Sequence, residues 1–401
     1  MVFTLLFFPI FLLSEVLLGV DVLFLDQAKC LWGKRIGLVT NHTGVNRDLH
    51  STVDLFLEQK EHISLIAVFS PEHGFNGSHP AGEKIENFSK NSIKFFSLYG
   101  ENRRPTEKML ENIDVLVYDI QEIGARPYTY ATTLFYIMEE AAKKKVAVYV
   151  LDRPNPMGGV LVDGPMLQEN MRSFLGYINI PYCHGMTIGE LACYFNGEYK
   201  VGVDLKIISM KGWQRSMTYQ DTKLYWIPTS PNIPEPDTPF YFASIGALGE
   251  LNIVNIGVGY TLPFKVIGAP WICGKDLAKK LNEQHLPGVI FAPCSFRPFF
   301  GLYKGENCEG VRIIITHYLV YRPLVIQYYL LGMLKSLYPK EFMSRIQNVS
   351  AQKKDLFFKV TGNEEIYNFL INEKYIIWKL IEFQKDEREQ FINKRQKYLL
   401  Y

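Results

Sequence analysis

The sequence predicts an α/β protein with a Rossmann-like N-terminal domain, built on a parallel sheet, and a smaller α+β C-terminal domain. Its 401 residues are roughly the length of two ordinary domains. Short β-branched runs alternate with stretches of helix length, as they do in βαβ units. A segment with five prolines in thirteen residues, 227–239, can hold neither a helix nor a central strand. We therefore expect the two domains to cover 20–238 and 239–401.

The N-terminal domain is expected to alternate strands with helices. The run KRIGLVT (34–40) predicts the first strand, and the amphipathic run STVDLFLEQ (51–59) predicts the first helix. The longest helix is expected over 132–145, where three consecutive lysines at its end favour the negative pole of the helix dipole. The same patterns predict further strands over 65–70, 94–100, 115–120, 146–152 and 205–210, and further helices over 106–113 and 186–195.

The C-terminal domain mixes strands and helices without that regular alternation. VRIIITH (311–317) predicts a strand, and LVIQYYLLGMLKSLY (324–338) predicts a helix. A charged helical tail is expected from about Asn363 onward.

The N-terminus predicts export to the periplasm, the cell envelope or the medium. Residues 1–13, MVFTLLFFPIFLL, are almost wholly apolar and resemble the core of a secretory signal, so we interpret residues 1–19 as a signal segment. The alternative is a buried N-terminal strand or helix. After the first 25 residues no apolar run is long enough to cross a bilayer, so no stable membrane span is expected there.

Composition excludes several classes of partner and cofactor. With 43 Lys and Arg against 41 Asp and Glu, the net charge of +2 gives no global field that would attract nucleic acid. None of the six cysteines forms a C-x-x-C pair, and the phosphate-binding glycine motifs of dinucleotide and P-loop proteins are absent. We therefore expect neither a metal nor an organic cofactor.

Polar residues follow four of the expected strands, at the end where ligands bind in open α/β sheets. Because parallel strands bring these ends to one edge, the four segments predict a single site. The segments are Thr40–Gly44, Ser70–Phe75, Asp119–Arg126 and Asp152–Pro156. A metal site built from Glu72 and His73 with Asp119 or His184 is an alternative, although the spacings are not diagnostic.

Ordered motifs along the chain resemble those of the NamZ-type exo-β-N-acetylmuramidases, a family of bacterial cell-wall glycosidases. The resemblance runs from about Gly19 to the end of the sequence. It implies a Rossmann-like domain, a smaller C-terminal domain that closes the cleft between them, and release of non-reducing terminal N-acetylmuramic acid from peptidoglycan-derived disaccharides and oligosaccharides. The motifs are SPEHGF (70–75), AGE (81–83), SLYGENRRPT (97–106), DIQEIGARPYTY (119–130), LDRPNPMGG (151–159), VDGPML (162–167), HGMTIGELA (184–192), SPNIPEPDT (230–238), GAPWI (268–272), CEGVRIIITH (308–317) and LYPKEF (337–342).

The resemblance also implies a set of site residues, led by Glu72 of the P-E-H-G motif as the catalytic acid, with His73 beside it. A glycosidase needs a protonated carboxyl group for the leaving oxygen and usually a second carboxylate. Asp119 and Glu122 are catalytic candidates, and Glu83 and Asp152 are further candidates for that second group. The substrate-binding candidates are Asn41, Arg104, Arg126, Tyr128, Asp152, Arg153, Asn155, His184 and Glu250.

Some of these residues could have purely structural roles instead. Glu72 could cap a helix or pair with Arg126, and an arginine beside a proline is as often a loop staple as a ligand. Tyr128 and Tyr130 could stack on a sugar or pack beneath the helix that they precede.

The stretch 250–260 departs from the family pattern, because Ile253 and Val258 stand where the family has a polar Asn and an Arg. The alternative function is therefore a non-catalytic muropeptide- or glycan-binding protein that kept the fold. A metal-dependent hydrolase is a third possibility.

Overall fold

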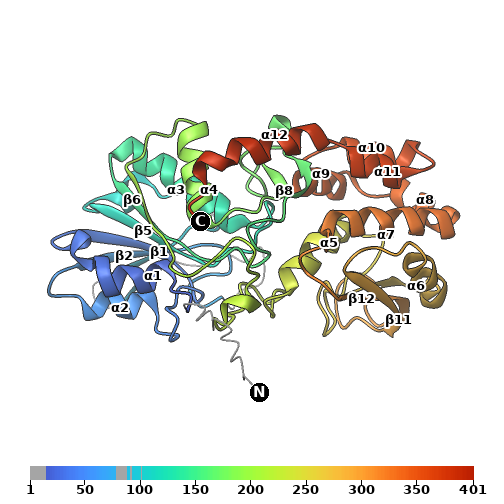
Figure 1. The fold of residues 1–401 in the computed structure, drawn as a ribbon, viewed down its shortest axis with the longest axis horizontal. Helices are drawn as coiled ribbons and strands as arrows, with labels where there is room; N and C mark the ends of the chain where they lie inside the picture. Colours follow the sequence, from blue (N-terminus) through green and yellow to red (C-terminus); the bar gives the residue numbers. More distant parts are fainter. Residues whose placement is uncertain (1–14, 78–87, 91–92, 101) are drawn as a thin grey trace, which may run out of the picture.

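The computed structural model describes residues 15–77, 88–90, 93–100 and 102–401 (Figure 1). The apolar run 1–13 and Glu83 lie outside these residues. Among the described residues, no helix combines the length and apolar character that a membrane crossing requires.

A seven-stranded sheet forms the centre of the N-terminal domain, in the order β3-β4-β2-β1-β5-β6-β9. Six of its strands are parallel, and only the edge strand β3 runs antiparallel. The order of the parallel strands reverses between β1 and β5, which is the switch point of a doubly wound sheet. The predicted Rossmann-like fold is thereby confirmed. The strands are β1 (Arg35–Thr40), β2 (Ser64–Ser70), β3 (Phe88–Lys90), β4 (Ile93–Ser97), β5 (Val115–Asp119), β6 (Ala147–Leu151) and β9 (Leu205–Ile208).

Helices cover both faces of this sheet. The short α1 (Gly19–Val22) and α2 (Thr52–Glu58) pack on one face, and α3 (Thr129–Lys144) and α4 (Ile188–Glu198) pack on the other. Strands β7 (Asp163–Met166) and β8 (Pro181–Cys183) pair antiparallel in a separate two-stranded sheet.

The helix expected over 106–113 is wrong, because only a 3₁₀ turn forms at Glu107–Leu110. Thr106 caps that turn by accepting the N–H of Met109. Asn112 then adopts a left-handed φ of 64°, which ends any helical path before β5 begins.

The residues after position 14 belong to the folded core. Leu18 is 2% exposed and packs under the sheet, while Val16 packs against Trp213. The N–H of Gly19 donates to the carbonyl of Asp152 at 2.9 Å. Residues 16–19, which fall within the segment that we interpreted as a signal, therefore contribute to the folded core.

The C-terminal domain holds an antiparallel sheet in the order β10-β12-β11 and a set of packed helices. The predicted helix over 324–338 is confirmed as α7, and the strand predicted over 311–317 begins earlier, at Cys308. The elements are α5 (Thr238–Leu251), β10 (Val266–Ala269), α6 (Gly274–Asn282), β11 (Val289–Phe296), β12 (Cys308–Ile315), α7 (Pro323–Leu337), α8 (Pro339–Gln347), α9 (Ala351–Thr361), α10 (Glu365–Asn372) and α11 (Ile376–Glu382).

The chain then returns to the N-terminal domain. Figure 1 shows α12 (Lys385–Arg395) running back across the top of the molecule, and Phe391 of this helix packs into the core between α3 and α4. The Tyr401 hydroxyl donates to Asp152 at 2.8 Å, just beyond β6. Residues 385–401 therefore pack against the N-terminal domain.

Candidate active site

The site lies at the carboxyl ends of the parallel strands, on the side that faces α5. Glu72 follows β2, and its Oε2 accepts a hydrogen bond from the Thr129 hydroxyl at 2.7 Å. Thr129 is the first residue of α3, so the carboxylate sits at a helix N-terminus, where negative charge is favoured. Glu72 is 9% exposed and does not pair with Arg126, whose partners are given below.

Glu122, three residues beyond the end of β5, is the carboxyl group with the most strongly shifted pKa in this region. Burial raises its pKa to about 8, although the N–H groups of Gly124 and Ile123 oppose that shift. Oε2 accepts the N–H of Gly124, whereas Oε1 is buried and has no hydrogen-bond partner among the described residues. Glu122 therefore carries a proton at neutral pH and has an unused polar atom.

His184 faces this carboxyl group from the end of β8. Its Nδ1 accepts the N–H of Met186 at 3.2 Å, so in the neutral ring the proton is on Nε2. Nε2 lies 3.8 Å from Glu122 Oε2 and has no hydrogen-bond partner among the described residues. Burial lowers the pKa of His184 to about 3, with Arg395 and Arg126 adding to the effect. The imidazole is therefore a neutral donor that the protein leaves unpaired.

Two tyrosines stand between the glutamates and the second domain. The Tyr128 hydroxyl donates to Thr229 Oγ1 at 2.8 Å, and the Tyr130 hydroxyl donates to the Thr229 carbonyl at 2.7 Å. Tyr128 interacts electrostatically with Glu122, and Tyr130 does so with Glu72. The ring of Tyr128 also packs 6.2 Å from that of Phe242 on α5. This aromatic pair therefore lies at the domain junction, near both carboxyl groups.

A cavity of about 310 Å³ opens on the C-terminal side of that junction. Phe242 lines it, which places the cavity beside Tyr128, and Lys353 of α9 supplies its cation. Glu250 also lines it, 3.6 Å from Lys353, and burial raises the pKa of Glu250. A carboxyl group and an ammonium group thus face a space large enough for one sugar ring.

The loop with the family departures is divided between core and cavity. Ile253 and Ile256 are 2% and 7% exposed and belong to the C-terminal core, whereas Val258 is partly exposed and lines the cavity. Gly257 and Gly259 have left-handed φ values of 80° and 86°. An added Cβ would lie 2.2 Å from a backbone oxygen in each case, so protein packing, not a ligand, requires these glycines.

Asp119 is engaged in a buried ion pair with Arg153. Arg153 Nε lies 2.6 Å from Oδ1 and an η nitrogen lies 2.9 Å from Oδ2, with the two side chains 3% and 0% exposed. The Thr52 hydroxyl donates to the same carboxylate. In this structure the two groups therefore face each other, and the catalytic role of Asp119 and the substrate-binding role of Arg153 stay predictions.

Asp152 caps α4 instead of facing a ligand. Its Oδ1 accepts the N–H groups of Arg153 and Gly189, and its Oδ2 accepts the hydroxyls of Thr187 and Tyr401. Burial raises its pKa to about 6, opposed by the hydrogen bonds from Gly189, Thr187 and Tyr401. In this structure Asp152 has a structural role, and the catalytic and substrate-binding roles expected for it stay predictions.

Arg126 and Arg104 also fall outside the site. The buried guanidinium of Arg126 donates to the carbonyls of Pro165 and Ile180 in the N-terminal domain, and to those of Val360 and Thr361 at the end of α9. Arg126 therefore links the two domains by hydrogen bonds. Arg104 instead pairs with Glu139 at 2.6 Å, on the far half of α3 from the strand ends. Both arginines therefore have protein partners here, and the substrate-binding roles expected for them stay predictions.

Two of the remaining predicted residues hold loops beside the site, and a third lies next to Glu72. Asn41 Oδ1 accepts the N–H and hydroxyl of Thr43, which fixes the loop after β1. Asn155 donates to the carbonyl of Met186 at 3.0 Å and thereby holds the loop that carries His184. His73 is buried next to Glu72 with a left-handed φ of 70°, a conformation in which its side chain diverges from the strand path.

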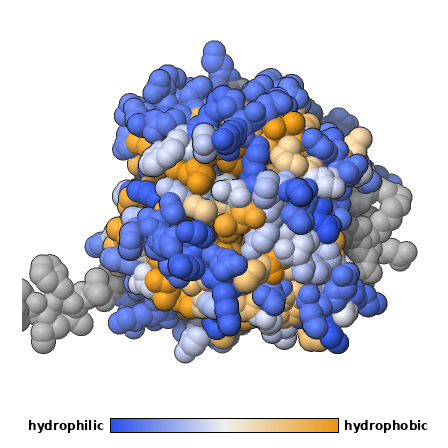
Figure 2. All heavy atoms as spheres, turned by 90° about the vertical axis from the view of Figure 1, so that its right-hand side faces the viewer, coloured by the Kyte–Doolittle hydropathy of each residue, from blue (hydrophilic) through white to orange (hydrophobic). Residues whose placement is uncertain are grey.

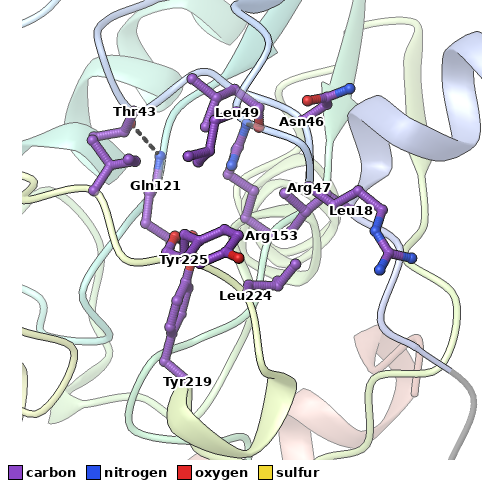
Figure 3. Close-up of a pocket in the computed structure, with 12 residues that line it drawn as sticks. Leu18, Thr43, Asn46, Arg47, Leu49, Gln121, Arg153, Tyr219, Leu224 and Tyr225 are labelled. Carbon is purple, nitrogen blue, oxygen red and sulfur yellow. Dashed lines mark hydrogen bonds between the residues drawn. The ribbon is translucent and has the colours of Figure 1, made fainter.

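The crevice at the switch point between β1 and β5 is largely filled by the protein itself. Figure 3 shows Arg153, Gln121 and Tyr225 converging on this pocket, with the N–H of Gln121 bonded to Thr43 Oγ1 at 3.0 Å. The ion-paired Arg153 closes its floor. The place where Rossmann folds hold a dinucleotide is thus occupied by side chains.

Sequence reasoning missed Thr129, Thr229 and Phe242. Thr229 lies in the proline-rich segment, which we interpreted only as a domain boundary, and a Thr-Ser pair among prolines was the available signal. Over the described ranges, no group of three or more His, Cys, Asp or Glu side chains is arranged to hold a metal ion.

Comparisons with known proteins agree with this architecture. Residues 36–237 match the family model for the N-terminal part of exo-β-N-acetylmuramidase NamZ, and residues 240–401 match the model for its C-terminal part. The peptidoglycan β-N-acetylmuramidase NamZ of Bacillus subtilis is 40% identical over 385 residues, which are 96% of this chain and 91% of that protein.

Two crystal structures of DUF1343 family proteins from Bacteroides fragilis share the fold. One has a TM-score of 0.90 at 40% identity and covers 96% of this chain and 99% of its own. The other has a TM-score of 0.76 at 27% identity and covers 97% and 99%.

Proposed function

Because the chain belongs to the NamZ family of exo-β-N-acetylmuramidases, we propose that it is a glycosidase that releases terminal N-acetylmuramic acid from the non-reducing ends of peptidoglycan fragments. The observation that carries this is the match of both family models, with 40% identity to a peptidoglycan β-N-acetylmuramidase along nearly the whole chain. The comparisons give no support to a non-catalytic binding protein.

The two glutamates at the strand ends divide the chemistry between them. Glycoside hydrolysis needs one carboxyl group that is protonated and one that is ionised. Glu122, with its pKa raised to about 8, holds a proton at neutral pH and delivers it to the leaving oxygen. Glu72 accepts a hydroxyl hydrogen bond at a helix N-terminus and acts as the second carboxylate. This reverses the role that the sequence suggested for Glu72.

The neutral His184 orients the acid and the sugar. Its Nε2–H points toward Glu122 and has no protein acceptor among the described residues, so it can donate to a substrate hydroxyl without competing for the acid's proton. Because its pKa is lowered to about 3, it remains neutral over the whole range in which Glu122 titrates.

Lys353 is the cation best placed for the lactyl carboxylate of muramic acid. Arg104, Arg126 and Arg153 all have protein partners, as described above, whereas Lys353 lines the cavity and is 41% exposed. In the described part of the chain its ion-pair partner is Glu250, whose own pKa is raised by burial. A substrate carboxylate can therefore replace Glu250 as the partner of this lysine.

The test uses a chromogenic β-N-acetylmuraminide, with the corresponding β-N-acetylglucosaminide as the substrate control. The wild type should hydrolyse the first and not the second. Glu122→Gln and Glu72→Gln should each lower kcat by roughly 100- to 10,000-fold, as expected for loss of a proton-transfer or carboxylate group. A chelator should leave the rate unchanged, since a rate that falls on chelation would point to the metal-dependent alternative.

We also propose that the protein is exported. The support is the apolar run 1–13, and because Val16 and Leu18 are buried, we expect a removed segment to end before Glu15. Expression of the full chain in a bacterium, fractionation, and N-terminal sequencing of the exported form test this. Retention of all the protein in the cytoplasm would contradict it.

A further inference from the structure

A second concave surface lies at the far end of the C-terminal domain, between α7, α8 and α11. It has a cavity volume of about 460 Å³ and shares no lining residue with the cavity beside Tyr128. Figure 2 views the molecule from this end and shows apolar side chains reaching the surface between hydrophilic ones. We call this surface the distal groove; it is lined by Gln284, Tyr329, Gly332, Met333, Lys335, Ser336, Pro339, Met343 and Lys374–Trp378.

The floor of the distal groove is formed by a close helix contact. A Cβ at Gly332 would lie 2.4 Å from the Ile377 side chain, so the absence of one lets α7 and α11 approach each other. Ile376 is 2% exposed and anchors the start of α11 in the C-terminal core. The beginning of α11 is therefore held rigidly at the edge of the groove.

Two aromatic rings on that edge face solvent. Tyr375 is 77% exposed and Trp378 is 69% exposed, and both belong to the lining of the groove. Burial in the core cannot account for rings that are so exposed. Flat aromatic faces on a rigid edge are suited to packing against the apolar face of a sugar ring, while the tyrosine hydroxyl and indole N–H serve as polar contacts.

The charge of the distal groove selects among ligands. Among the described residues, the charged side chains in its lining are Lys335 and Lys374, and none is acidic. Lys335 Nζ donates to the carbonyls of Leu370 and Glu373 at 2.7 and 2.6 Å, which fixes the ammonium group and leaves its third N–H without an acceptor in the described part of the chain. The groove thus offers ring-packing surfaces beside two positive charges.

We propose that the distal groove binds a stretch of peptidoglycan away from the active site, with sugar rings on Trp378 and Tyr375 and carboxylates of the stem peptides near Lys374 and Lys335. The inference rests on the proposed function, which supplies a polymer with both sugar ring faces and peptide carboxylates as the natural surroundings of the enzyme. Gln284 and Ser336 add side-chain partners for hydroxyl and acetamido groups. Binding here holds the enzyme on the polymer while the active site processes chain ends.

The experiment measures co-sedimentation with insoluble, purified peptidoglycan, using Glu122→Gln as the background so that the polymer is not consumed. The double variant Tyr375→Ala/Trp378→Ala is compared with Leu25→Ala/Trp32→Ala, which removes exposed apolar side chains (69% and 44% exposed) from the N-terminal domain. We expect the first pair to weaken binding by about tenfold or more, because two packing surfaces are lost. The control pair should bind as the background does.

A second arm tests the charge. Lys374→Gln should weaken binding to peptidoglycan by about threefold, as expected for an exposed charge pair, but should not change binding to insoluble chitin, which carries no carboxylates. Vesicles containing phosphatidylglycerol test the competing lipid surface. Binding to vesicles but not to peptidoglycan would overturn the proposal, as would unchanged peptidoglycan binding in the aromatic double variant.

The same variants separate this proposal from the proposed function. In the otherwise wild-type protein, Tyr375→Ala/Trp378→Ala should hydrolyse the soluble chromogenic muraminide at the wild-type rate. If the wild type itself fails to hydrolyse that substrate, the proposed function fails, whatever the sedimentation shows. If hydrolysis is normal and sedimentation is unaffected by the aromatic change, the distal groove is not a glycan site.

Discussion

Replacing Asp119 by Asn tests whether this carboxylate holds the fold together or takes part in the reaction. The change leaves the Arg153 guanidinium 3% exposed and without its bidentate counter-ion. Breaking a buried ion pair by removing one partner costs about 3–5 kcal/mol, because the other charge remains desolvated. For a domain of about 200 residues, each kcal/mol shifts Tm by roughly 2–4 °C, so the expected fall in Tm is about 6–20 °C.

Thermal unfolding followed by circular dichroism at pH 7 measures this loss, and Asp114→Asn is the matched control. Asp114 also pairs with an arginine at the sheet, Arg35 at 2.8 Å, but these side chains are 32% and 47% exposed. Loss of such a pair costs about 0–1 kcal/mol. The reasoning is refuted if the two variants unfold at similar temperatures, or if Asp119→Asn is fully stable but inactive, because Asp119 would then act in the reaction.

Three further changes probe the site and its supports. Glu122→Gln should remove a pH dependence of stability. In the wild type the stabilisation from the protonated carboxyl group is present below its ordinary pKa of 4.5 and is lost as pH rises through about 8, so the variant should gain stability relative to the wild type between pH 5 and pH 8 in urea unfolding. The same difference in unfolding free energy between variant and wild type at pH 5 and at pH 8 would count against the raised pKa. Arg395→Met removes the N–H groups that hold the carbonyls of His184 and Gly185, and should cost about 1–3 kcal/mol in unfolding free energy and lower kcat, with partial rescue in Arg395→Lys; an unchanged kcat would show that the loop does not need this support. Val258→Arg places a cation in the cavity beside Lys353, from a partly exposed position, so KM should fall several-fold with a loss of stability below about 1 kcal/mol. A large drop in Tm without a fall in KM would mean that the position belongs to the core.

Periodicity was sufficient to predict the parallel strands of the large sheet and the edge at which the candidate site lies, but not the antiparallel edge strand β3. The β-branched runs identify the parallel strands because strands buried on both faces must be apolar throughout, and polar residues can then appear only where the strands end. The 3₁₀ turn at Glu107–Leu110 escaped this reasoning, since a single left-handed residue at Asn112 decided the outcome.

The roles of individual side chains could not be read in the same way. Asp119 and Glu122 are three residues apart at one strand end, yet one is paired with Arg153 and the other is left protonated. That difference depends on which neighbour each carboxylate meets after the strands have aligned. Likewise, Arg126 looked like a ligand for an anion, but its partners at Val360 and Thr361 are more than 200 residues away in sequence.

The return of residues 385–401 to the N-terminal domain has a consequence for the order in which the enzyme matures. During synthesis, the β8 loop with His184 leaves the ribosome some 200 residues before Arg395, whose side chain holds that loop. Until then, Asp152 also lacks the Tyr401 hydroxyl. The sheet can assemble early, whereas the imidazole that faces Glu122 is fixed only after translation of the second domain. A nascent or truncated chain without Arg395 would therefore lack the support that holds the loop with His184.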